Sequence, residues 1–220
     1  MRTLKLITGL ALLPLALAAQ QTWSDRLAAL PDNVRDQVVQ IVTDAASRGL
    51  PGQAIADRAL ETVAKSRSGA EAVAAAQALA ADLSSGRDAL TAAGRTPDAS
   101  EIEAAATAKE LGVDGATISD LASSAPSGRS LAVPLAVIGA LVKRGLPSDD
   151  ALAAVQERLS NRATDAELAS MPGDAGRLIA EGYRPSDVGR ALGAGRPAGL
   201  PANSGRAGAR PSTPGHPGRP

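Results

Sequence analysis

Residues 31–51 read PDNVRDQVVQIVTDAASRGLP, and this stretch decides the fold class. Its apolar residues recur at the spacing of one face of an α-helix. They are Val34, Val38, Ile41, Val42 and Ala45. Asp32 is placed to cap the start of this helix, and Gly49 stands where a helix ends in a left-handed residue. Leu50 and Pro51 follow as a packing residue and a helix breaker, so the stretch predicts a helix, a stop and the start of a second helix.

The same stop-and-start pattern recurs along the chain. It is found at residues 144–148 (RGLPS) and 181–186 (EGYRPS), with a shorter relative at 112–114 (GVD). These copies follow one another at the roughly 35-residue spacing of helix-pair repeats. Because the sequence lacks the tetratricopeptide and ankyrin signatures, we favour an irregular helical bundle over a solenoid of repeats. The sequence therefore predicts an all-α fold, either an irregular helical bundle or a short helix-pair array.

Further helices are expected from the capping signals and the alanine content. An alanine-rich helix is expected from about residue 70 to 83, with continuation past Gly86 toward residue 93. N-caps are expected at Asp98, Asp114, Ser148, Thr164 and Ser186, with capping-box partners Glu101 and Glu167. The helical domain is expected to span residues 19–192.

The start of the chain has the features of a cleaved signal peptide. Arg2 and Lys5 precede an apolar run over residues 6–18, which ends in the small-x-small pattern Ala16-Leu17-Ala18. The run is shorter than the ~20 residues that span a bilayer. No Cys follows it, so a lipid-anchored protein is excluded. We expect residues 1–18 to be removed after Ala18 and the mature protein to be periplasmic or secreted.

The composition limits how a core can be built. The chain has no Cys, so no disulfide holds it together, and Trp23 and Tyr183 are its aromatic residues. Alanine has the best helix propensity but contributes little buried area. Helices rich in alanine must therefore approach closely to exclude water, and we expect a thin core.

The charge is balanced over the chain but unevenly distributed. The 23 basic and 23 acidic residues cancel formally, yet residues 193–220 carry Arg196, Arg206, Arg210 and Arg219 and no acid. This Gly/Pro/Arg-rich tail cannot bury enough apolar area to fold, so we expect it to be disordered. It is either a solvated tail or a weak, salt-sensitive contact to a polyanion of the envelope. Nucleic-acid binding is disfavoured because the body is acidic and no aromatics interleave with the arginines.

The residue inventory excludes most catalytic templates. His216, in the tail, is the one histidine, so a Ser-His-Asp triad or a multi-histidine metal site is not possible. Asp114-Gly115 resembles part of a calcium loop, but Leu121 stands where that loop requires glutamate. We therefore predict no catalytic, cofactor-binding or metal-ligating residue and no cofactor.

Two acid pairs, Glu101/Glu103 and Asp149/Asp150, keep a carboxylate-dependent enzyme open as an alternative. Each pair also falls in the first turn of an expected helix, where acids are stabilising for structural reasons.

The apolar stretch Leu131 to Val142 also has two interpretations, a segment that inserts into a membrane or a helix of the protein core. It is too short to span a membrane, so we expect a helix buried among other helices and no transmembrane span.

The stretch SLAVPLAVI at residues 130–138, continuing to Gly145-Leu146-Pro147, resembles a segment of a group of uncharacterised exported helical proteins of GC-rich bacteria. The turn Gly49-Leu50-Pro51 is similar to that group's pattern as well. The resemblance implies export and a helical fold, and it carries no functional residue. By elimination, the sequence favours a non-enzymatic role in the cell envelope, binding or scaffolding another protein. An envelope-associated factor held by its basic tail is a further alternative.

Overall fold

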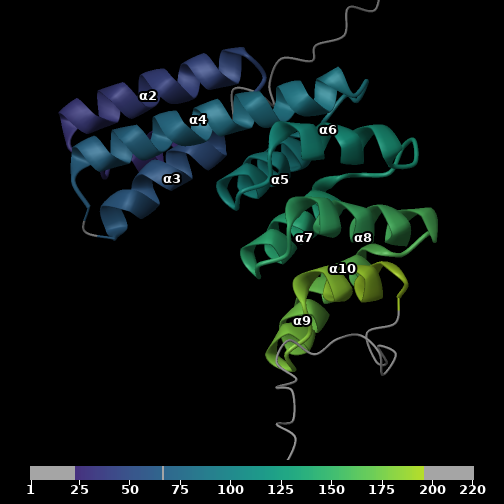
Figure 1. Cartoon of the computed structure of the whole chain (residues 1–220). Coiled ribbons are helices and arrows are strands. Elements are labelled where there is room, and N and C mark those ends of the chain that lie inside the picture. The colour runs from purple at the N-terminus through teal and green to yellow at the C-terminus, as the bar shows by residue number, and fades with distance from the viewer. Residues whose placement is uncertain (1–22, 66, 196–220) are drawn as a thin grey trace, which may run out of the picture. The chain divides into compact units, whose positions relative to one another are not determined.

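A computed structural model describes residues 23–65 and 67–195, and its regular elements are helices (Figure 1). The predicted all-α fold is confirmed for these residues. The predicted signal peptide, and the tail from residue 196, lie outside the described residues. Contacts between Cα atoms divide the chain into two compact units. The boundary falls between Ala81 and Asp82, inside the long helix α4 (Gly69–Ala92).

Unit 1 contains a helical turn at residues 23–27, α2 (Asp32–Ser47), α3 (Gly52–Ala64) and the first part of α4. Trp23 and Leu27 are buried. The stop between α2 and α3 has the predicted form. Gly49 has a φ of 76°, and the N–H of Leu50 donates to the carbonyl of Ala45 at 3.0 Å. The apolar face of residues 31–51 is therefore the face that α2 buries.

Most of the expected helix starts are present, but proline changes some of them. Three expected N-caps accept a backbone N–H as predicted: Asp98, Asp114 and Thr164. The prediction of Ser148 as an N-cap was wrong, because Pro147 takes that position with φ −56° and ψ 144°. The prediction of Asp32 as an N-cap was wrong for the same reason, because Pro31 takes that position. The prediction of Ser186 as the N-cap of the last helix was also wrong, because that helix already begins at Pro185. A proline with extended ψ has the N-cap geometry, so the helix begins directly after it.

Unit 2 is a helix-pair array in two layers (Figure 1). Besides the end of α4 from Asp82 onward, its helices are α5 (Ala99–Glu110), α6 (Gly115–Ser124), α7 (Ala132–Lys143), α8 (Ser148–Ser160), α9 (Asp165–Ala180) and α10 (Pro185–Gly193). We call α5, α7 and α9 the A layer, because α7 packs between the other two. We call α6, α8 and α10 the B layer, in which α8 packs on both neighbours. Of the two predicted arrangements, unit 2 therefore has the helix-pair array.

The three helix pairs of unit 2 share one register around their turn glycines. Gly112, Gly145 and Gly182 have φ values of 98°, 95° and 88°. In each turn the next N–H donates back to the last turn of the A helix, to the carbonyls of Ala108, Leu141 and Leu178. The residue six positions after each turn glycine lies in the following B helix and is fully buried. These residues are Ile118, Ala151 and Val188. This common register aligns equivalent faces of successive helices.

Glycines let the stacked helices approach closely. Gly139 of α7 lies against Ala108 of α5 and against Leu111, the residue after that helix, and a Cβ atom there would be 3.2 Å from the Cα of Ala108. Gly189 of α10 lies in a similar way against the backbone of Asp150 on α8. Such contacts bury helix backbone instead of large side chains. They explain how a chain without Phe builds a core, as the composition predicted.

Candidate functional site

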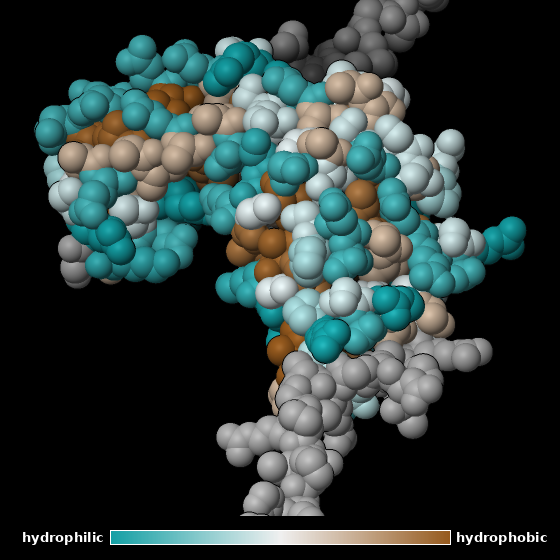
Figure 2. Space-filling model, viewed as in Figure 1, coloured by the Kyte–Doolittle hydropathy of each residue, from teal (hydrophilic) through white to brown (hydrophobic). Residues whose placement is uncertain are grey.

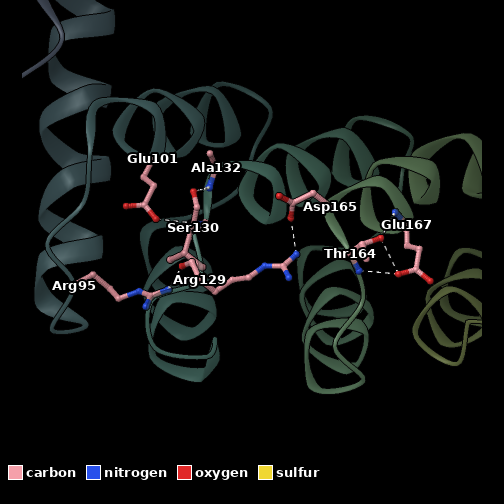
Figure 3. A network of polar contacts seen from close by, with 9 residues as sticks. Arg95, Glu101, Arg129, Ser130, Ala132, Thr164, Asp165 and Glu167 are labelled. Carbon is pink, nitrogen blue, oxygen red and sulfur yellow. Dashed lines mark hydrogen bonds and ion pairs between the residues drawn. The ribbon is translucent and has the colours of Figure 1, made fainter.

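The first candidate acid, Glu101, is buried and holds two helix starts together (Figure 3). Its Oε2 accepts the N–H of Asp98 at 3.1 Å, which completes the capping box of α5. Its Oε1 accepts the N–H of Leu131 at 2.7 Å, at the start of α7. The carboxylate therefore satisfies two backbone donors that would otherwise lack partners, and its role is structural.

Two arginines extend this connection along the edge where the A helices begin (Figure 3). Arg95 donates to the carbonyl of Arg129 at 3.0 Å, across 34 residues of sequence. Arg129 donates in turn to the carboxylate of Asp165, across 36 residues. Each arginine thus links one repeat to the next. The side chains of this edge are engaged in holding the array rather than in forming a cleft.

The two predicted acid pairs do not converge. Glu103 is exposed and lies two residues from buried Glu101, so the two side chains point to different sides of α5. Asp149 is exposed at the start of α8, whereas Asp150 packs against Gly189 of α10. A glycosidase-type mechanism needs two carboxylates facing one substrate. Neither pair has that arrangement.

The titration of the capping acids also follows from structure. Hydrogen bonds from Ser100 and from the Glu101 N–H lower the pKa of Asp98. The N–H of Thr117 lowers the pKa of Asp114, and Thr164 lowers that of Glu167 in the same way. These acids are held as anions, whereas a general acid near neutral pH requires a raised pKa. Among residues 23–65 and 67–195, no cluster of His, Asp and Glu could hold a metal ion.

A hollow of unit 1 lies between α3 and α4 and has a volume of about 570 Å³. Four of the charged side chains that line it form two ion pairs. Lys65 contacts Glu61 at 2.6 Å and Arg67 contacts Glu71 at 3.0 Å. These pairs follow the helical i,i+4 spacing, which makes them ordinary surface pairs.

The predicted buried helix is confirmed in α7. Leu135, Ile138 and Leu141 are fully buried, and α7 packs between α5 and α9 and against α8. In the part of the chain that the structure describes, no helix is long and apolar enough to cross a membrane. The basic tail predicted to contact a polyanion, with Arg196, lies outside the described residues.

The A layer has an outer face that the sequence analysis did not identify. Four register positions are exposed or half-buried on each of its helices, at the three- and four-residue steps of one helix face. They are Ser100, Glu103, Thr107 and Glu110 on α5; Val133, Ala136, Ala140 and Lys143 on α7; and Ser170, Gly173, Arg177 and Ala180 on α9. We call these twelve residues the A face. Counting back from each turn glycine would have found them.

Known proteins offer no guide to this face. No protein family, curated protein or solved structure matches the chain.

The side chains of the A face give it a defined chemistry. Its central column, on α7, presents Val133, Ala136 and Ala140, which are short and apolar. Lys143 ends this column, and Glu103 and Glu110 lie on the α5 side. Arg177 lies on the α9 side, where it is paired with Asp174 and Glu181. A row of short apolar side chains beside two acidic side chains is suited to contact with another chain, because apolar contact gives affinity and the neighbouring charges give orientation.

Proposed function

We propose that this chain is an exported, non-enzymatic protein of the cell envelope that binds or scaffolds another protein through the A face of unit 2. The observation that carries the proposal is the common register of the three helix pairs, which aligns one face of α5, α7 and α9. Helix-pair arrays use such extended aligned faces for binding protein partners. Residues 1–18 support export, so the partner is sought in the periplasm or outside the cell.

The arrangement of the acids supports a binding role over catalysis. Glu101 is occupied by two backbone N–H donors, and Glu103 points elsewhere. The capping acids have lowered pKa values, which suits stable anions. A surface that only binds needs complementarity in shape and charge, and the A face can supply both.

The test is recovery of a partner from the native envelope fraction. The bait is the mature full chain, residues 19–220, compared with an Ala136→Arg variant. Ala136 is exposed at the centre of the A face, so an arginine there blocks close contact without entering the core. The matched control is Ala116→Arg, an exposed alanine on α6 of the B layer. Far-UV circular dichroism checks that both variants fold.

We expect the parent chain and Ala116→Arg to recover the same protein stoichiometrically, and Ala136→Arg to lose it. Equal recovery by both variants would exclude the A face as the binding surface. If the parent recovers nothing, the binding role itself loses its support, and substrate screening becomes the next experiment.

A further inference from the structure

The last stacking interface of the B layer carries a shallow groove of about 230 Å³ between α8 and α10. Buried Ala154 and Gly189 lie at its base, and Asp150 and Glu157 line its α8 side. Arg190 lines the α10 side, but it is paired with Asp187 at 3.3 Å. The groove therefore has small residues at its base and a negative net charge.

The preceding interface of the same layer is bridged by a hydrogen bond between side chains. Between α6 and α8, the side chain of Gln156 donates to the hydroxyl of Ser124 at 2.8 Å and bridges the two helices. Gly193 stands at the same distance from its turn glycine as Gln156 does, so α10 has no side chain there to form a bridge. The carboxylate of Glu157 lies over Gly193 instead. The surface over α8 and α10 is mainly hydrophilic (Figure 2).

The chain leaves α10 at the end of this groove. The two helices run parallel, because Asp150 lies against Gly189 and Ala154 against Gly193. Gly195 then lies beside the guanidinium of Arg158 on α8. Residues 196–220 thus begin next to the groove, which is only about 10 Å long from Asp150 to Glu157 at helical rise. An extended chain reaches roughly 3.3 Å per residue, so the tail can cover it several times over.

The composition of the tail matches the groove. It carries four arginines, at positions 196, 206, 210 and 219, and no acid. Most of its other residues are Gly, Ala, Pro and Ser, whose small side chains suit a shallow floor. We propose that this tail docks in the α8–α10 groove of its own chain, with arginine side chains paired to Asp150 and Glu157. The groove belongs to the B layer, so the proposal does not depend on the binding role of the A face.

The test uses disulfide crosslinking in the full mature chain, which has no native Cys. Ala153→Cys places a thiol on the exposed rim of the groove, and Ser204→Cys places one in the tail beside Arg206. The rate of intramolecular disulfide formation is compared with the rate after Asp150→Asn and Glu157→Gln are added to the same pair. The control adds Glu110→Gln and Asp120→Asn, which remove two exposed acids outside the groove.

We expect crosslinking to be about fivefold slower when the groove acids are neutralised, the loss expected for two exposed ion pairs. The crosslinking rate should also fall in high salt, which screens ion pairs. In the control variant it should stay close to the rate of the parent pair. Equal rates in the groove and control variants would overturn the proposal. The tail would then be free for a polyanion, which binding to vesicles of anionic lipid would measure.

Discussion

The close packing of α4 against α5 makes a quantitative prediction about a single methyl group. A Cβ atom at Gly86 would lie 2.9 Å from the Cβ of Ala105 and 3.3 Å from the backbone nitrogen of Ala106. Because one of these neighbours is backbone, it cannot rotate away. At Gly173, inside α9 of the same unit, an added Cβ meets nothing within 4 Å.

The two glycines therefore form a matched pair for substitution by alanine. Each substitution gains the same helix propensity, about 1 kcal/mol. Gly173→Ala should keep that gain, whereas Gly86→Ala should lose about 1–3 kcal/mol to overpacking. The difference in unfolding free energy between the two variants isolates the packing cost, because the propensity term is common to both.

The measurement is urea unfolding followed by far-UV circular dichroism, with the midpoints and slopes of the parent and both variants compared. We expect Gly173→Ala to unfold at higher urea than the parent and Gly86→Ala to unfold at lower urea than Gly173→Ala. Equal shifts in the two variants would refute the reasoning, since they would mean that α4 and α5 are not in contact through Gly86.

Three further predictions follow from the buried and capping residues. Glu101→Ala should lower the unfolding free energy by about 2–4 kcal/mol in urea unfolding, because it leaves the N–H groups of Asp98 and Leu131 without acceptors; Glu101→Gln, which keeps an acceptor oxygen, should cost less. Ile138→Asp should unfold unit 2 by placing a charge in its core, whereas Ala136→Asp, on the exposed side of the same helix, should leave the circular dichroism spectrum unchanged. The lowered pKa values of Asp98, Asp114 and Glu167 add stability above their ordinary values of 3.8 for Asp and 4.5 for Glu, so urea midpoints should fall as the pH drops through and below this range, and less steeply in an Asp114→Asn variant.

The parts of the fold that the sequence predicted are those determined locally. Gly49 and Gly145 end helices because a left-handed residue is needed there, and that need is visible in the neighbouring residues. The capping box of Thr164 and Glu167 is likewise contained within four residues. The N-caps at Pro31 and Pro147 were not predicted, because the serine or aspartate that follows each proline is the residue type that usually caps a helix.

The parts that it did not predict depend on contacts between distant residues. Glu101 has the spacing of a cap, but its bond to the N–H of Leu131 crosses 30 residues. The division into A and B layers depends on which helix packs on which, and the apolar periodicity of α7 does not specify that. The A face could be identified only after the positions in the three helix pairs were numbered from their turn glycines, because equivalent positions then coincide.

The repeat-to-repeat links along the edge of the A layer have a consequence for how unit 2 folds. The connections made by Arg95, Arg129 and Glu101 each join neighbouring repeats and span 30 to 36 residues. Each of these links reaches from one repeat to the next, which is the nearest-neighbour pattern of helical-repeat proteins. Unit 2 should therefore form by growth from any helix pair, and under mechanical load it should come apart pair by pair rather than all at once.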